Sequence, residues 1–260
     1  MGKINIEPRF FHIAIDYGNF ILFDKLLDEI DPSNLKNQKK MEILFRFHYP
    51  NSKYVSYFTI ERYKKIIDTL KIDLNSTCYG YTPLTHLVNY YEGYTYGCRD
   101  SKHGKELIDY LLSRSDININ KPDRERGFPV LQCYLMDVSS NSEFDKTFIE
   151  RLKGLGANLN WCDKRGQNLL HRICNFDHYY SNRNTRLLKY LIFSTDIDFE
   201  KKDKDGNTPL DLAEKSIIDE EEAYQKAMRE KSQYYTPTRD SVEKAIAIRD
   251  ILKGRIKGGI

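Results

Sequence analysis

The sequence lacks the features that mark several classes of protein. Its apolar runs fall far short of the ~20 residues that a membrane-spanning helix needs. Its 41 basic and 38 acidic residues nearly cancel, so the net charge of +3 gives no general excess of cations for neutralising nucleic-acid phosphates. The N-terminal residues contain no apolar segment of the kind that secretory signals have. We therefore expect a chain that binds neither membranes nor nucleic acid.

Cysteine is also scarce. The five cysteines are odd in number and scattered without short spacings, which is typical of reduced thiols in a cytosol. No Cys-x-x-Cys pair occurs, and the glycines stand singly rather than in a phosphate-binding loop. We expect no metal and no cofactor, although cysteines and histidines do form two loose sets: Cys78, His86, Cys98 and His103, and then Cys162, His171, Cys174 and His178.

What the chain does contain is a repeated turn followed by the start of a helix. In residues 203–213, Asp205 and Gly206 favour a tight turn, because glycine reaches positive φ without steric cost. Thr208 can cap the helix, and Pro209 suits the first helical position, where no backbone N–H is needed. The same pattern begins at Gly80, and degenerate copies begin at the glycines of positions 127 and 166.

Two spacings indicate the length of the repeat. The turn glycines step by 47, 39 and 40 residues, from 80 to 127, 166 and 206. Residues 110–123 resemble residues 190–203, and these segments lie 80 positions apart, which is two repeats of about 40. The chain is therefore expected to be a repeat protein.

The turn and helix start resemble the ankyrin-repeat signature, Thr-Pro-Leu-His-x-Ala after a glycine turn. Asp211 stands at the histidine position of the last copy, whereas His171 retains the histidine. The resemblance implies an all-α ankyrin solenoid of about six helix–turn–helix units in a single domain, residues 1–260. Residues 38–75 fit least, and the sequence leaves open whether they form a true ankyrin unit. The expected units are approximately 5–32, 38–76, 77–121, 124–160, 163–202 and 203–254.

Several units carry long insertions between their two helices, at residues 91–103, 137–145, 176–184 and 217–240. In the last unit we expect the first helix to end near Ser216, a charged helix to follow within the insertion to about Lys231, and the closing helix to be capped by Asp240 with Glu243. In the first helix of the chain, Ile13, Ala14 and Tyr17 are expected to share one face. Insertions on one face often mark where a repeat protein binds.

Tyrosines gather around the first insertion. Tyrosine combines an apolar body with a polar tip and is enriched at interfaces, although such residues can equally pack against the insertion or cover the core. The resemblance implies that residues flanking the turn glycine, and those ending the first helix, face a concave groove. This aromatic and basic strip suits a partner with acidic and apolar side chains. The predicted partner-binding residues are Tyr79, Tyr81, Asn89, Tyr90, Tyr94, Tyr96, Arg126, Phe128, Met136, Arg165, Gln167, Asn175 and Phe176.

The function that the resemblance implies is a non-catalytic protein–protein interaction module. The chain resembles the free-standing ankyrin effectors of intracellular bacteria and large DNA viruses, which implies a cytoplasmic monomer with a host protein partner, acting in the host cytosol after specialised secretion. Two alternatives stay open. One is an enzyme with a Cys/His site at His171 and Cys174, although the family's histidine has a structural role. The other is an adaptor for a ubiquitin ligase, whose C-terminal box would have to fit within residues 241–260.

Overall fold

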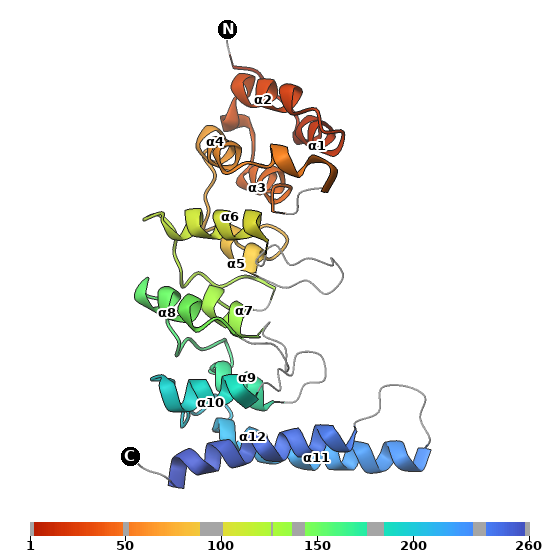
Figure 1. Ribbon diagram of the computed structural model, residues 1–260, viewed down its shortest axis with the longest axis vertical. Coiled ribbons are helices and arrows are strands. Elements are labelled where there is room, and N and C mark those ends of the chain that lie inside the picture. The colour runs from red at the N-terminus through yellow and green to blue at the C-terminus, as the bar shows by residue number, and fades with distance from the viewer. Residues whose placement is uncertain are drawn as a thin grey trace. The chain divides into compact units, whose positions relative to one another are not determined.

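The computed structural model describes residues 3–48, 52–88, 101–125, 127–136, 144–175, 185–230 and 238–257. Their regular structure is helical, and the β-type pairing among them is limited to two isolated bridges, Ile4 with Ile30 and Cys78 with Tyr81. The expected all-α architecture is confirmed for this part of the chain (Figure 1). None of the helices described is long and apolar enough to cross a membrane.

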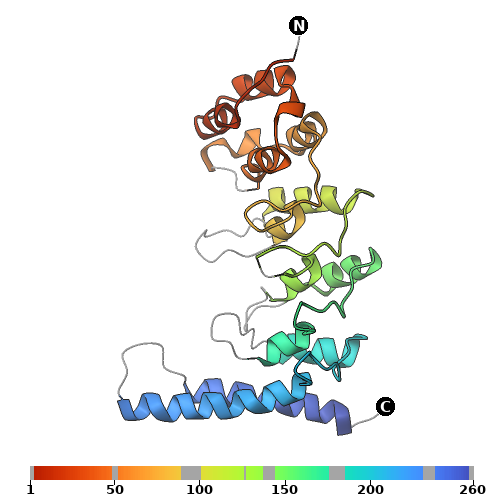
Figure 2. The ribbon, with the colours of Figure 1, turned by 180° about the vertical axis from the view of Figure 1, so that it is seen from behind.

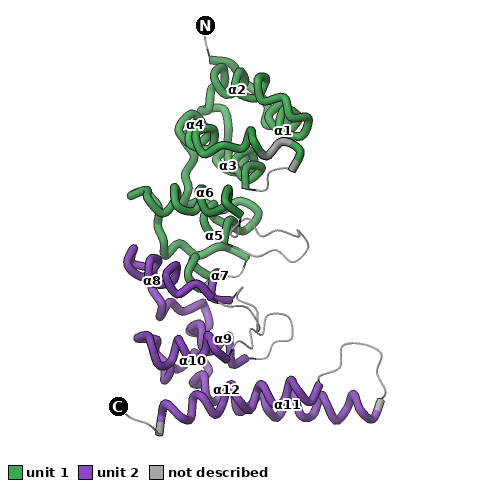
Figure 3. Tube along the Cα trace, in the orientation of Figure 1, with its two compact units in different colours: residues 1–133 green, residues 134–260 purple. Residues whose placement is uncertain are grey.

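The helices follow one another as pairs joined by turns. In chain order they are α1 (Pro8–Asp16), α2 (Phe20–Glu29), η1 (Pro32–Asn34), α3 (Asn37–Phe45), η2 (Ser52–Tyr57), α4 (Ile60–Leu70), α5 (Pro83–Val88), α6 (Lys102–Leu112), α7 (Val130–Met136), α8 (Lys146–Gly154), α9 (Leu169–Cys174), α10 (Thr185–Ser194), α11 (Pro209–Glu230) and α12 (Arg239–Lys257). The chain divides into two compact units, residues 1–133 and 134–260, and the division falls inside α7 (Figure 3). That the repeats make up one domain stays a prediction.

Unit 1 is built from helix pairs in two layers. In both views α1 lies beside α2 and α3 beside α4 (Figures 1 and 2), and α5 contacts α6 in the same manner. Between pairs, α1 contacts α3, while α2, α4 and α6 contact one another in sequence. The divergent residues 38–75 therefore supply a helix pair that stacks in register with its neighbours, as each repeat needs in order to bury its apolar face.

The first helix has apolar residues on two sides and buries one of them. Phe11, Ala14 and Ile15 are buried, whereas Ile13 is 47% exposed and Tyr17 is 78% exposed. Positions three and four apart share one face of a helix, and the set that begins at Phe11 points at the core.

Side chains of asparagine join successive repeats in both units. In unit 1, Asn75 Nδ2 donates to the carbonyl of Asp116 at 2.7 Å, and Asn75 Oδ1 accepts the Asn118 N–H at 2.7 Å. In unit 2, Asn160 makes the same pair of bonds to the backbone at positions 196 and 198, at 3.0 and 2.7 Å. Each asparagine thus satisfies backbone groups of the following repeat that would otherwise lack partners.

In unit 2 the last helix pair is longer than expected. The expected end of the first helix near Ser216 is wrong, because α11 continues without a break to Glu230 through the acidic run at 219–222. The charged segment is helical as expected, but it is part of this same helix. The four acidic residues splay around the helix, and only Glu220 among them is buried. The helix α11 packs along α12 and also contacts α9, so its length is stabilised by two neighbours.

The closing helix is also capped differently. Thr238 and Ser241 form the reciprocal pair, in which the Thr238 N–H donates to Ser241 Oγ at 3.2 Å and the Ser241 N–H donates to Thr238 Oγ1 at 3.3 Å. The expected cap residue, Asp240, instead forms an ion pair with Lys244 at 2.7 Å. Helix α12 therefore begins at Arg239, two residues earlier than a cap at Asp240 would place it.

Candidate functional site

The turns that precede α9 and α11 are each organised by an aspartate. Asp203 Oδ1 accepts the backbone N–H groups of Asp205 and Asn207 at 3.0 and 2.9 Å. Asp163 makes the equivalent bonds at positions 165 and 167, at 2.8 and 3.0 Å. Each aspartate stands three residues before a turn glycine with positive φ. This recurring spacing was the signal that could have identified both turns from the sequence.

His171 connects two neighbouring turns, which confirms the structural role that the family resemblance implies. Its Nε2 donates to the carbonyl of Asn207 at 3.1 Å. Its Nδ1 lies 3.2 Å from the backbone nitrogen of Asn168, and Asn168 Oδ1 accepts the His171 N–H at 3.2 Å. Burial lowers the pKa of His171, so the ring is neutral at pH 7 and both nitrogens are engaged within the fold.

Cys174 lacks the environment of a catalytic nucleophile. The side chain is fully buried, and burial raises the pKa of its thiol, which keeps it protonated. A reactive cysteine needs a thiolate beside an available base, whereas the ring of His171 already bonds Asn168 and the turn at Asn207. The geometry of these residues gives the Cys/His enzyme hypothesis no support.

The two loose Cys/His sets do not assemble a metal site in the part of the chain that the structure describes, where no three His, Cys, Asp or Glu side chains converge. His103 Nε2 donates to the carbonyl of Phe47 at 2.7 Å, and His86 contacts His48. Cys98 and His178 lie outside the described residues.

The predicted partner-binding residues fall into three groups. Tyr79 and Arg165 are exposed, and Met136 and Asn175 are half-buried. Tyr81, Phe128 and Gln167 are buried. The remaining ones lie outside the described residues: Asn89, Tyr90, Tyr94, Tyr96, Arg126 and Phe176.

The three buried side chains do not suit direct contact with a partner. Tyr81 is 7% exposed and Phe128 is 3% exposed. Gln167 is 4% exposed, and its Nε2 donates to Asp203 Oδ2 in the next turn at 3.0 Å. Of the two residues that flank a turn glycine, one side chain faces outward and the other faces the core. The comparison with the family pattern therefore assigned some core residues to the groove.

Tyr79 occupies the tip of a short hairpin in unit 1. Cys78 and Tyr81 exchange backbone hydrogen bonds of 2.9 and 3.0 Å across it. The two central residues have positive φ, 51° at Tyr79 and 87° at Gly80, the combination that a type I′ turn requires. The first position of such a turn usually carries Asn, Asp or Gly, and a tyrosine there costs about 1 kcal/mol of backbone strain. The Tyr79 side chain is nevertheless 65% exposed.

The hairpin is held firmly by the turn of the next repeat. The Arg124 N–H donates to the carbonyl of Gly80. A Cβ atom at Gly80 would lie 3.1 Å from both Cβ and Oε2 of Glu125, so a side chain there would require Glu125 to move. Tyr79 is therefore presented on a rigid support.

Charged groups surround the base of this hairpin. Lys39 Nζ forms an ion pair with Glu42 at 2.9 Å, and only 8% of the Glu42 residue is exposed. Partial burial, and then the negative charge of Glu42, raise the pKa of Tyr79. The Tyr79 hydroxyl thus remains a hydrogen-bond donor at neutral pH.

Unit 1 also contains a pair of histidines, the buried His48 and the half-buried His86, that the sequence analysis did not identify. His48 Nδ1 lies 2.6 Å from His86 Nδ1, and His48 Nε2 lies 2.9 Å from the Tyr63 hydroxyl. The His86 ring stacks on Phe45 with centroids 4.1 Å apart. Burial lowers the pKa of His86 to about 4 and holds that of His48 well below its usual value. Both rings are neutral at pH 7.

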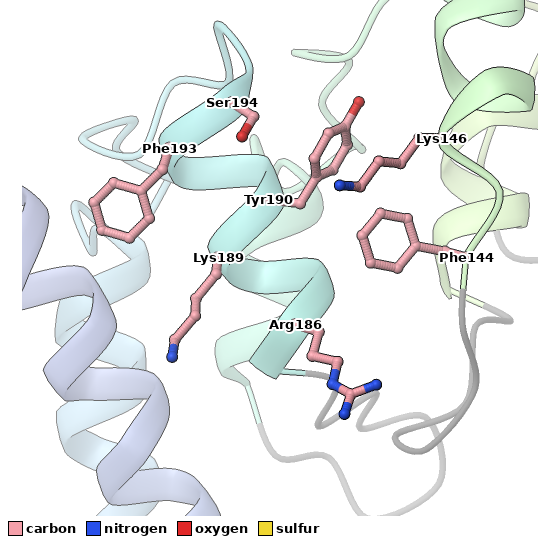
Figure 4. A pocket seen from close by; sticks show the side chains of 7 residues that line it. All are labelled: Phe144, Lys146, Arg186, Lys189, Tyr190, Phe193 and Ser194. Carbon is pink, nitrogen blue, oxygen red and sulfur yellow. The ribbon is translucent and has the colours of Figure 1, made fainter.

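Unit 2 has an open pocket of about 580 Å³ between the start of α8 and the exposed face of α10 (Figure 4). Phe144 and Tyr190 pack with ring centroids 5.2 Å apart, and Lys146 Nζ lies 5.4 Å from the centroid of the Tyr190 ring. The Tyr190 hydroxyl donates to Glu150 Oε1 at 2.7 Å. The burial of Tyr190, followed by its bond to Glu150, raises the pKa of Tyr190 to about 12. The residues that line the pocket are Phe144, Lys146, Arg186, Lys189, Tyr190, Phe193 and Ser194.

Comparisons with known proteins give limited information about this chain. No protein-family model matches it. No curated protein matches it either. Among solved structures, the chain is similar to the ankyrin repeat domain of Bcl-3, a member of the IkappaB protein family, at 16% sequence identity and a TM-score of 0.45. The match covers 97% of this chain and 100% of that domain. A likeness at this level carries no argument about function, which must come from the contacts within the chain itself.

Proposed function

We propose that this chain is a non-catalytic protein-interaction module, and that the hairpin of Tyr79 is part of the surface that contacts the partner. The observation that carries the proposal is a large aromatic side chain, 65% exposed, held at a φ of 51° where glycine would fit without strain. Strained backbone positions cluster at functional sites. Tyrosine is enriched among the residues that contribute most to binding between proteins.

The exposed Arg165 is a second candidate contact, on the corresponding turn of unit 2. The backbone N–H of Arg165 donates to the Asp163 carboxylate at 2.8 Å, so the backbone from which the guanidinium extends is held in a defined position. Arginine, like tyrosine, is enriched where binding energy concentrates. The half-buried Met136 and Asn175 complete the described members of the predicted surface.

The adaptor alternative is less well supported than simple partner binding. A ligase-recruiting box would require part of residues 241–260, but the helix α12 uses this segment for packing against α10 and α11. Its buried residues are Val242, Ala245, Ile248 and Leu252. On the sequence resemblance we further propose a host protein as the partner of a monomeric chain that acts in the cytoplasm.

Site-specific photo-crosslinking tests the proposal. Benzoylphenylalanine is introduced at Tyr79 in one sample and at Tyr17, which is also in unit 1 and 78% exposed, in a matched control. In eukaryotic cell lysate we expect a discrete crosslinked protein from position 79 and none from position 17. Excess unmodified wild-type chain should suppress this product, whereas excess Tyr79→Ala chain should not. Identical products from both positions, or none from position 79, would contradict the proposal.

A further inference from the structure

The exposed face of α10 carries a cluster that the hairpin surface does not use. This helix buries its apolar stripe, Leu187, Leu188, Leu191 and Ile192. Residues spaced by three and four share a helix face, and the opposite stripe holds two cations and two aromatic rings. These are Arg186, Lys189, Tyr190 and Phe193. Phe144 and Lys146 from the start of α8 extend the cluster into the open pocket (Figure 4).

Among the residues that the structure describes, the charges that line this pocket are of one sign: the lining includes Lys146, Arg186 and Lys189, and none of its described residues is acidic. The ion pairs found among the described residues involve neither Arg186 nor Lys189. A carboxylate that contacts the cluster, that of Glu150, is bonded to the Tyr190 hydroxyl at 2.7 Å and to Lys153 at 3.3 Å. In a chain whose basic and acidic residues almost balance, this is a local cationic surface.

The aromatic part of the pocket is exposed but well positioned. Phe193 is 53% exposed, which is high for a ring on a helix of the core. Tyr190 is fixed by its bond to Glu150 and by its packing against Phe144. A pocket of about 580 Å³ lies within the range of ligand sites, roughly 300–1,000 Å³. It has room for one large side chain with its flanking backbone.

We propose that this pocket binds an acidic peptide segment that carries an aromatic or large aliphatic side chain. The carboxylates of the segment would meet Arg186 and Lys189, and Arg186 can bond a carboxylate through two N–H groups at once. The apolar side chain would cover the exposed ring of Phe193 and remove it from water. The site is separate from the Tyr79 hairpin, and it adds a class of partner to the proposed function.

The geometry favours a peptide over single-stranded nucleic acid. Successive bases of a single strand stack on several free aromatic faces, whereas the Tyr190 ring already has Lys146 over it and Phe144 beside it, which leaves Phe193 as the exposed ring of the described lining. Nucleic acid binding is accordingly an outcome that the test can detect.

A subtractive peptide selection tests the proposal. A phage library of random 12-residue peptides is selected on the full wild-type chain after depletion on the Arg186→Glu/Lys189→Glu variant. We expect the surviving peptides to combine carboxylates with an aromatic or large aliphatic residue. A fluorescein-labelled peptide of the selected consensus should then bind the charge-reversed variant at least about tenfold more weakly than the wild type.

Matched variants separate a pocket from a general charge effect. Lys226→Glu/Arg229→Glu changes the net charge equally on exposed positions of α11, and it should leave the affinity within about twofold. Phe193→Ala keeps the charge and should weaken binding about threefold to tenfold. Circular dichroism confirms that each variant is folded. The proposal is overturned if no peptide survives depletion, if the survivors are not acidic, if both charge variants lose binding equally, or if a 12-nucleotide oligouridine displaces the peptide.

Discussion

The Nδ1 atoms of His48 and His86 lie 2.6 Å apart in the interior of unit 1. At this distance one ring donates a proton and the other accepts it, and two charged rings would repel each other strongly. His48 also contacts the Tyr63 hydroxyl, and His103 bonds the carbonyl of Phe47 close by in the chain. Burial lowers the pKa of both rings, so the pair is neutral at pH 7 and protonation destabilises it.

Lowering the pH should consequently destabilise unit 1 before the carboxylates begin to take up protons. The folded pKa of His86 is about 4 and the ordinary value is 6.5, so the unfolded chain binds the proton first as the pH falls. The stabilisation of the folded state by the neutral His86 ring is complete above pH 6.5 and is lost progressively down to pH 4. For this one residue the free energy of unfolding falls by roughly 3 kcal/mol over that range. Urea unfolding followed by circular dichroism at pH 7.5, 6 and 5 measures the loss. His86→Asn should flatten the dependence over this range, and an unchanged slope in this variant would contradict the assignment.

Replacing Tyr79 by glycine should raise stability while it abolishes partner capture. Glycine adopts the φ of 51° without strain, which we expect to add about 0.5–1 kcal/mol to the free energy of unfolding. Lys71 has the same φ at the end of α4, so Lys71→Gly is the matched control. It should stabilise similarly and retain binding in the crosslinking competition. If Tyr79→Gly competed as well as the wild type does, Tyr79 would not be a contact.

Alanine at Gly80 should be far more harmful than alanine at Gly127. Both glycines have positive φ, 87° and 71°, so each substitution incurs about 1 kcal/mol of backbone strain. Only at Gly80 does the added Cβ meet a neighbour, Glu125, at 3.1 Å, whereas at Gly127 the space is open. We expect Gly80→Ala to lose about 1–3 kcal/mol more than Gly127→Ala in urea unfolding. Equal losses would show that the hairpin can move away from the next turn.

Truncation of Phe128 should affect stability rather than recognition. Its ring is 3% exposed, so Phe128→Ala is expected to lower the free energy of unfolding by about 3–5 kcal/mol. The exposed Arg165 should tolerate alanine within about 0.5 kcal/mol. Thermal melts of the two variants distinguish these effects. A small loss at Phe128 would mean that its ring is available to a partner after all.

The repeat signals in the sequence located the helices well, because turns and caps depend on residues close together in the chain. The pair of Thr208 and Asp211 illustrates this, since Asp211 Oδ2 accepts the Thr208 N–H at 2.8 Å. Asp211 thus makes at its own helix start the local bond that a histidine makes elsewhere. Spacing along the chain likewise accounts for the apolar stripe of α4, whose residues lie three and four apart and are buried: Tyr63, Ile66, Ile67 and Leu70.

Which side chains remain for a partner was decided by tertiary packing. Tyr79 and Tyr81 are two residues apart on one hairpin, yet the first is 65% and the second 7% exposed. Sequence pattern treats them alike, because exposure depends on residues about 45 positions later that pack against the turn. The histidine pair and the α10 pocket also depend on tertiary packing, because they join segments that lie 38 and about 45 residues apart in the chain. The sequence alone determined the repeats and their turns, and the stacking of one repeat on the next determined the surfaces.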